Sequence, residues 1–169
     1  MRVLVTVASR HGGTREIGTA VAGVLRGAGH DVAEVDPDEV DSLDGYDAVV
    51  LGSAVYVGRL AAALRELVDR LPAQLAARPV WLFWSGPVGE PPLPPTEPDD
   101  VGVVARRVGA RDVACFAGRL ERSELGLAER ALVAMIDAEP GDFRDFAEVE
   151  AWAASVAGGL AWTERTGRR

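Results

Sequence analysis

Residues that bind metals or form cross-links are scarce in this sequence. Its 169 residues include one cysteine, Cys115, and two histidines, His11 and His30. A single cysteine excludes a disulfide within the chain, and because it lies in an apolar run we expect its thiol to be buried. The histidines, the cysteine and the carboxylates show no spacing typical of a metal site, and no Ser-His-Asp or Cys-His arrangement can be recognised. We therefore predict no metal.

Lysine is absent. All 18 basic residues are arginine, which we attribute to composition bias, and 26 acidic residues give the chain a formal net charge of -8. This charge argues against binding nucleic acid through a broad basic face, because neutralising phosphates requires clustered cations. An acidic surface either keeps the protein soluble or docks a basic partner, and the charge alone does not choose between these roles.

Long hydrophobic runs are also missing. No apolar stretch reaches the roughly 20 residues that span a bilayer, so we expect no transmembrane segment. The N-terminus leads directly into a strand-like run, without the apolar region and cleavage site of a signal peptide, so we expect a cytoplasmic protein. Hydrophobic residues make up 48% of the chain, and its length suits one globular domain. We assign residues 1–162 to this domain and 163–169, which have no apolar periodicity, to a disordered tail.

Strand and helix patterns alternate along the whole chain. Short apolar, β-branched runs predict strands, and apolar residues spaced three and four apart predict helices. The expected strands are 3–7, 31–35, 46–51, 80–84 and 113–117, and the expected helices are 14–28, 60–71, 101–108, 125–136 and 146–160. This alternation predicts an α/β fold with a doubly wound, five-stranded parallel sheet and helices on both faces. Ligands of such sheets bind beyond the carboxyl ends of the strands, which directs attention to the loops after the first, third and fourth strands.

The loop after the first expected strand is a candidate phosphate site. Its residues are Ser9, Arg10, His11, Gly12, Gly13 and Thr14. Glycines let the backbone approach an anion, the start of the following helix offers unpaired N–H groups, and the two hydroxyls add donors. The loop lacks the Gly-Lys-Ser/Thr of a Walker A motif and the Gly-x-Gly-x-x-Gly of a dinucleotide fingerprint, so its size suits one terminal phosphate. Taken alone, it is equally well a glycine-rich turn capped by Thr14.

Aromatic residues accompany the ends of the third and fourth expected strands. The residues of interest there are Ser53, Ala54, Tyr56 and Gly58, and then Trp84, Ser85, Gly86 and Gly89. Tyr56 and Trp84 could stack on a planar ring, with backbone N–H groups of residues 85–89 at its polar edge. Equally, Tyr56 could pack on the next helix, and Trp84 could be the last core residue of its strand. The third loop continues as a proline-rich segment over residues 86–100.

The three loops together describe one ligand. Parallel strands bring them to the same edge of the sheet, where a terminal phosphate and a flat heterocycle can be bound side by side, as FMN requires. Arg10 could pair with the phosphate, and His11 either contacts the ligand or is a partly exposed loop residue. We therefore predict FMN as the cofactor, bound by the residues named in the three loops.

From Met1 to about Leu160 the chain resembles the flavodoxin superfamily, and within it the menaquinone-dependent protoporphyrinogen dehydrogenase branch. The Ser/Thr-Arg-x-Gly-x-Thr loop of that branch is matched by Ser9, Arg10, Gly12 and Thr14, and its second loop by Gly52 and Gly58. Further matches are Phe116-Ala117-Gly118-Arg119-Leu120, Gly141-Asp142-Phe143-Arg144-Asp145 and Trp152. The resemblance implies a flavodoxin-like sheet of strand order 2-1-3-4-5 that binds FMN.

The resemblance also implies a function. It points to an oxidoreductase related to quinone-linked protoporphyrinogen dehydrogenase, with a porphyrinogen or another small organic substrate and a quinone or a redox partner protein. In that branch the segment before the last helix is basic and aromatic, whereas residues 121–139 of this chain are acidic overall. Two alternatives therefore stay open: a flavodoxin-type electron carrier, which the acidic surface favours, and a flavodoxin-like binding module that has lost FMN. Whether the protein is an enzyme is left open.

Overall fold

A parallel sheet forms the centre of the computed structural model, which describes residues 1–88, 97–135 and 140–167. Five parallel strands pair in the order β2-β1-β3-β5-β6. Their bounds are β1 (Arg2–Ala8), β2 (Asp31–Glu34), β3 (Ala48–Tyr56), β5 (Val80–Ser85) and β6 (Val113–Phe116). Counted along the chain these are the first to fifth parallel strands, so the predicted order 2-1-3-4-5 is confirmed.

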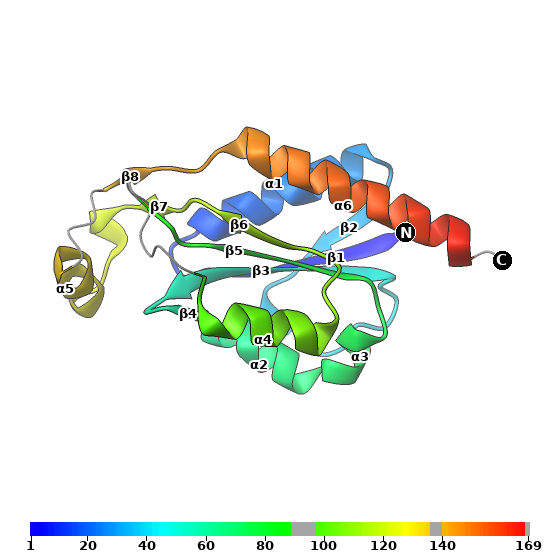
Figure 1. Ribbon diagram of the computed structural model, residues 1–169, viewed down its shortest axis with the longest axis horizontal. Coiled ribbons are helices and arrows are strands. Elements are labelled where there is room, and N and C mark those ends of the chain that lie inside the picture. Colours follow the sequence, from blue (N-terminus) through cyan, green and yellow to red (C-terminus); the bar gives the residue numbers. More distant parts are fainter. Residues whose placement is uncertain (89–96, 136–139, 168–169) are drawn as a thin grey trace.

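Helices cover both faces of this sheet (Figure 1). On one face, α1 (Gly13–Gly27) packs against α6 (Phe146–Gly167). On the other lie α2 (Ala62–Arg70), α3 (Pro72–Ala76) and α4 (Asp99–Val108). The structure is therefore three-layered, as the alternation of strands and helices predicts.

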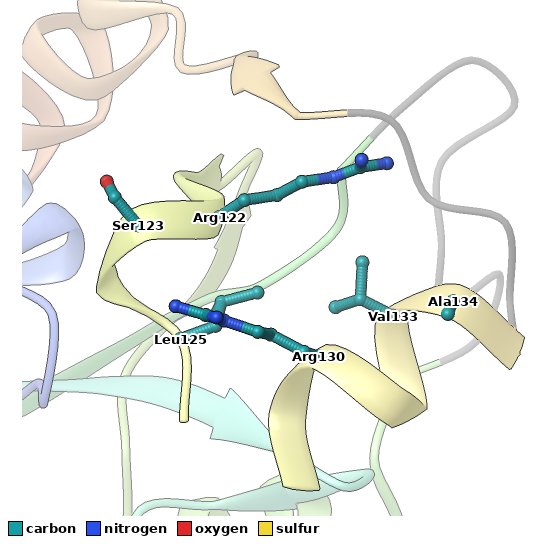
Figure 2. A pocket seen from close by; sticks show the side chains of 6 residues that line it. All are labelled: Arg122, Ser123, Leu125, Arg130, Val133 and Ala134. Carbon is teal, nitrogen blue, oxygen red and sulfur yellow. The ribbon is translucent and has the colours of Figure 1, made fainter. Parts of the chain in front are cut away.

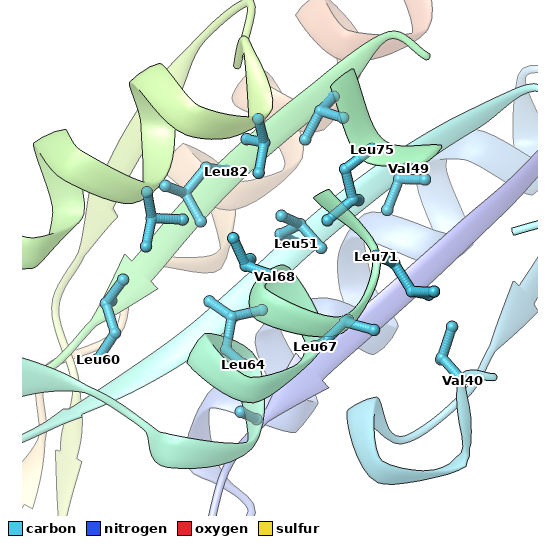
Figure 3. Close-up of a cluster of buried hydrophobic side chains, with 14 of the residues drawn as sticks. Val40, Val49, Leu51, Leu60, Leu64, Leu67, Val68, Leu71, Leu75 and Leu82 are labelled. Carbon is cyan, nitrogen blue, oxygen red and sulfur yellow. The ribbon is translucent and has the colours of Figure 1, made fainter. Parts of the chain in front are cut away.

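Each face of the sheet buries its own apolar cluster, because successive residues of a strand point to opposite faces. In β5, Leu82 and Trp84 belong to the cluster beneath α2 and α4, part of which is drawn in Figure 3. Trp81 and Phe83 belong to the cluster beneath α1 and α6. Burial on both faces explains why the central strands are continuous apolar runs rather than alternating ones.

Several short elements lie at the carboxyl edge of the sheet. β4 (Arg59–Leu60) pairs antiparallel with the end of β3, and β7 (Arg119–Leu120) pairs antiparallel with β8 (Gly141–Asp142). The 3-10 turn η2 (Arg122–Glu124) and the helix α5 (Leu127–Met135) come between β7 and β8, and a second 3-10 turn, η1 (Pro37–Glu39), follows β2. Figure 1 shows β7, β8 and α5 at the end of the molecule where α1 begins.

The structure corrects the predicted end of the third strand. We expected it to end at residue 51, but β3 continues to Tyr56, so Ser53, Ala54 and Tyr56 are strand residues and not loop residues. The run of small residues at 52–54 suggests a loop from sequence alone. In the fold, small size is required at Gly52 by the side chains of Phe83 and Val7 on the neighbouring strands.

Other expectations are also corrected. Cys115 is exposed and not buried, since it lies on β6, an edge strand that pairs on one side only. The last helix extends to Gly167, so residues 163–167 are helical and not a tail. Gly89 and most of the proline-rich segment lie outside the described residues.

Over the described ranges, none of the helices has the length and apolar character needed to cross a membrane.

Gly52 of β3 is paired with Val7 of β1 on one side and with Phe83 of β5 on the other. A Cβ at this position would be 2.4 Å from Cζ of Phe83 and 2.9 Å from Cγ2 of Val7. Both side chains are buried, and Phe83 is fully enclosed. A methyl group therefore has no space unless the core moves.

Gly52→Ala is expected to lower the free energy of unfolding by about 1–3 kcal/mol, because it overpacks the core. Gly23→Ala is the control: an added Cβ on this α1 residue meets no atom within 4 Å, and replacing a helical glycine by alanine should stabilise by about 0.8–1 kcal/mol. Urea unfolding followed by circular dichroism measures both changes. A Gly52→Ala variant as stable as the wild type would contradict the packing described.

Cys115 is exposed, but its thiol ionises with difficulty. Partial loss of solvent around the sulfur, and after it the charges of Glu148 and Glu97, raise the pKa of the Cys115 thiol to about 11. The thiolate is the reactive form, so alkylation by iodoacetamide at neutral pH should be slow and should accelerate up to about pH 11. Glu148→Gln should speed the labelling at pH 8, whereas Glu150→Gln, on the same helix, should not. Rapid labelling of the folded protein at pH 7 would disprove this.

Candidate functional site

The loop between β1 and α1, residues 9–12, reaches the carboxyl edge of the sheet and leads into the first turn of α1. Gly12 is the N-cap of that helix and has a φ of 78°, a conformation that glycine adopts without strain. No atom lies within 4 Å of the position that a Cβ of Gly12 would take, so the backbone is open on that side. Thr14 is buried in the first turn. The first N–H groups of the helix have no partner within it, and together with the helix dipole they favour an anion.

Tyr56 connects the end of β3 to residues 9–14, which we call the phosphate loop after the role predicted for them. Its hydroxyl accepts a hydrogen bond from the backbone N–H of Arg10 at 2.7 Å. The Arg10 guanidinium lies over the Tyr56 ring, 4.8 Å from its centroid, and the His11 ring approaches edge-on at 6.1 Å. Arg10 and His11 of the first predicted loop are thus brought together with Tyr56 of the second. The parallel pairing of β1 with β3, in which Ala8 lies opposite Ser53, places them there.

The turn after Tyr56 contains an unusual backbone conformation. Val57 and Gly58 have φ values of 50° and 69°, and they form the two-residue turn of the β3–β4 hairpin. Positive φ at both positions is what such a turn requires, and Gly58 supplies it readily. Val57 does so at a cost, because a β-branched residue clashes with its own backbone there. Its side chain is 78% exposed, so this strain and this apolar surface both lie beside the candidate site.

Ser53 and Ala54 support the start of α2. The buried Ser53 hydroxyl donates to the carbonyl of Ala54 at 2.8 Å and accepts the N–H of Ala61 at 2.9 Å. The carbonyl of Ala54 also accepts the N–H of Ala61, at 3.1 Å. Both residues were predicted as cofactor contacts, and the bonds that the structure gives them are internal ones.

Trp84 lies in the core at the end of β5, which is the second of the two roles considered for it. Its side chain is only 3% exposed and belongs to the cluster beneath α2 and α4. It therefore offers no open ring face for stacking. Its indole N–H is buried and has no hydrogen-bond partner among the described residues.

The third loop packs on its neighbours as far as it can be followed. The Ser85 hydroxyl is 3.4 Å from the carbonyl of Ala117, and a Cβ on Gly86 would lie 3.1 Å from that of Val55. The N–H of Gly118 donates to the carbonyl of Pro87 at 2.7 Å. Ser85 and Gly86 therefore lie at the same edge as the phosphate loop. Gly89, the last predicted contact, is outside the described residues.

Two arginines that were not predicted as site residues donate hydrogen bonds to backbone carbonyls of the phosphate loop. Arg144 donates to the carbonyl of Gly13 at 2.9 Å and to Glu16 Oε2 at 2.7 Å. Arg119 donates to the carbonyl of His11 at 3.2 Å and to Glu16 Oε1 at 3.2 Å. We call this group, with Asp142 and Glu124, the arginine cluster. From sequence these arginines stand out only within the two motifs of the resemblance, which give them no role.

Each arginine of the arginine cluster is paired with carboxylates. Arg144 also pairs with Asp142, at 2.6 Å, and its side chain is only 4% exposed. The hydrogen bonds from Arg144 keep the pKa of the Asp142 carboxyl below its usual value, and the same bonds raise the pKa of Arg144. Arg119 has a second carboxylate partner in Glu124, at 3.1 Å. The Arg144–Asp142 pair is therefore ionised at neutral pH.

A cavity of about 470 Å³ lies between η2 and α5, on the segment that follows Arg119. Figure 2 shows Arg122 entering it from η2 and Arg130 from α5. Leu125, Val133 and Ala134 supply apolar surface. Nearby on α5, Leu127 and Met135 are largely exposed. Over the described ranges, no cluster of three or more histidine, cysteine or acidic residues could hold a metal ion.

Comparison with curated proteins gives a partial match. Over 81 residues the chain is 33% identical to the protoporphyrinogen IX dehydrogenase [quinone] of Escherichia coli strain K12. The match covers 47% of this chain and 45% of that protein, so it spans about half the length of the relative.

Solved structures match over most of the chain. A flavodoxin from the domain Archaea aligns over 95% of this chain and 99% of its own, with a TM-score of 0.66 and 15% identity. Flavodoxin 1 of Bacillus cereus aligns over 91% and 95%, with a TM-score of 0.62 and 16% identity. Rubredoxin oxygen:oxidoreductase of Desulfovibrio gigas aligns over 95% of this chain and 36% of its own, with a TM-score of 0.65 and 10% identity. Similarity at such low identity demonstrates a shared fold.

Family membership comes from the sequence itself. The family model described as the flavodoxin domain matches residues 4–146, which is most of the chain. The matched range contains the phosphate loop, both aromatic segments and the arginine cluster. The chain therefore belongs to the flavodoxin domain family, and FMN is the cofactor that this membership implies.

Proposed function

We propose that the protein is an FMN-dependent oxidoreductase whose phosphate loop, residues 9–14, binds the phosphate of FMN. The observation that carries this proposal is the open backbone at Gly12 next to the N-terminus of α1. When bound, FMN supplies one- and two-electron redox chemistry, and the protein's task is to hold and orient it. The residues of the loop perform the first part of that task.

The residues present fit the phosphate part of FMN well. Backbone N–H groups at the start of α1, with the hydroxyls of Ser9 and Thr14 close by in sequence, are the donors that a phosphate needs. The Tyr56 hydroxyl accepts one loop N–H, that of Arg10, so this donor faces the end of β3. For the ring, Tyr56 is the accessible aromatic of the two predicted, since Trp84 is in the core.

A quinone-linked dehydrogenase activity is the finer proposal. It is supported by the partial match to the E. coli enzyme and by the cavity between η2 and α5. The volume of that cavity is in the range of small-molecule sites. Two guanidinium groups over apolar surface suit an organic substrate that is largely apolar and carries carboxylates, as a porphyrinogen does. The quinone would accept the electrons.

An electron carrier without its own substrate is the second candidate. The net charge of -8 favours it, because an acidic surface steers a basic redox partner towards the protein. The two candidates share the FMN site and differ in whether the cavity between η2 and α5 is used. A wild type that takes up no FMN would instead be a flavodoxin-like binding module.

The purified protein is expected to be yellow, or to become so with added FMN, and Ser9→Ala with Thr14→Ala should weaken FMN binding. Hydrogen bonds to charged groups contribute about 1.5–3 kcal/mol each, so the double variant should raise the Kd for FMN at least about tenfold. Flavin fluorescence titration measures this. Thr19→Ala is the matched control, since this hydroxyl, also on α1, bonds to Glu34 at 2.8 Å, away from the loop. A colourless wild type that takes up no FMN would rule out both redox functions.

Oxidation of protoporphyrinogen with a menaquinone analogue tests the finer proposal. If the cavity between η2 and α5 binds the substrate, Arg122→Gln with Arg130→Gln should raise KM about tenfold, as charged hydrogen bonds are lost, and leave the Kd for FMN unchanged. Arg106→Gln, an exposed arginine on α4, is the control. No turnover by the wild type, together with rapid reduction by a flavodoxin reductase, would favour the carrier instead.

A further inference from the structure

We propose that Arg144, assisted by Arg119, is a positioning residue that fixes the phosphate loop in the conformation that binds FMN; this assignment rests on the FMN site proposed above. The two arginines hold carbonyl oxygens two residues apart, those of Gly13 and His11. They also bind the two oxygens of one carboxylate, Glu16, in the first turn of α1. The loop is therefore restrained at two peptide groups and at the helix that follows it.

The restrained carbonyls determine where the loop's donors point. In a planar trans peptide the C=O and the following N–H point in opposite directions. The Gly13 carbonyl faces Arg144, so the N–H of Thr14 faces away from it. The His11 carbonyl faces Arg119, so the N–H of Gly12 likewise faces away. Both N–H groups are thus directed to the side of the loop opposite the arginine cluster, where an anion can approach.

The arginine cluster does not attract the phosphate by its net charge. Its two guanidinium groups are matched by three carboxylates, those of Glu16, Glu124 and Asp142. The group therefore carries no net positive charge. Its effect on a phosphate comes through the orientation of the backbone, with the arginines also neutralising Glu16, which would otherwise repel an anion at the start of α1.

The arrangement is rigid enough for this role. The Arg144 side chain is buried, lies over the Phe146 ring at 5.1 Å from its centroid, and makes four hydrogen bonds to Asp142, Gly13 and Glu16 through its side chain. Arg119 is on β7, directly opposite Asp142 of β8. The short β7–β8 pair therefore brings the two arginines to the loop from segments more than 100 residues away in sequence.

The test compares FMN with riboflavin, which has the same ring and no phosphate. Arg144→Gln should raise the Kd for FMN at least tenfold and change the Kd for riboflavin less than twofold, both measured by flavin fluorescence. Arg144→Lys should lose most of the same FMN affinity, because an ammonium group cannot reproduce the planar fork of bonds. Arg26→Gln is the matched control: Arg26 pairs with Glu34 at 2.8 Å and with the Val32 carbonyl at 2.9 Å at the other end of α1.

Several outcomes would overturn the assignment. An unchanged Kd for FMN in Arg144→Gln would do so, and so would full recovery in Arg144→Lys, which would show that charge alone matters. Equal weakening of FMN and riboflavin would indicate a general loss of structure. If Arg144→Gln does not fold by circular dichroism, the more exposed Arg119→Gln replaces it, with a several-fold rise in the Kd for FMN expected and an unchanged Kd overturning the proposal.

A failure of the FMN site itself is distinguishable. If the wild type binds neither FMN nor riboflavin, the proposed function fails, and the positioning role is decided by amide hydrogen exchange. Faster exchange at Gly12 and Thr14 in Arg144→Gln than in Arg26→Gln would support the restraint of the loop. Equal exchange in the two variants would overturn it.

Discussion

Parallel pairing of β1, β3 and β5 is the constraint on which the rest of the site depends. Ala8, Ser53 and Trp84 lie side by side across the three strands. Because the strands are parallel, the chain leaves all three at the same edge, and segments distant in sequence must meet there. The contact of the Tyr56 hydroxyl with the N–H of Arg10 is a direct consequence. The return of the chain through β7 and β8 adds the arginine cluster to this edge.

The sequence predicted the parts of this arrangement that have local signals. Apolar runs and helical spacing are local, so the five parallel strands were predicted correctly, and their order followed from the resemblance to flavodoxins. The position of residues 9–14, between a strand and a helix, was predicted for the same reason, since a strand, two glycines and a helix start follow one another; their binding of a phosphate stays a prediction. The predicted end of β3 was wrong because Gly52, Ser53 and Ala54 look like a loop. Gly52 is small because the side chains of Phe83 and Val7, on other strands, leave no space for a Cβ. No local pattern carries that information.

Trp84 and the arginines show two different limits of sequence reasoning. The burial of Trp84 follows from strand geometry: it shares a face with Leu82, which is fully buried, so the core role was the better of the two alternatives. The contacts of Arg144 could not be derived in this way, because its partners Gly13 and Glu16 are 131 and 128 residues away. A residue whose role is to bind the backbone of a distant segment has no characteristic spacing in the sequence by which it could be recognised.

Arg119 connects the two halves of the proposed function. One of its nitrogens donates both to the His11 carbonyl in the phosphate loop and to Glu124 in η2. The neighbouring residue Arg122 of η2 lines the cavity between η2 and α5. The loop that would bind the cofactor and the turn that borders the cavity therefore share one support, and neither can move far without straining the bonds of Arg119. In the proposed FMN site the arginine cluster has no net positive charge, so its contribution is to orient the N–H donors of the loop before the anion arrives. Because the chain lacks lysine, oriented backbone N–H groups, with Arg10 of the same loop, take the place of the Walker A lysine in the proposed site.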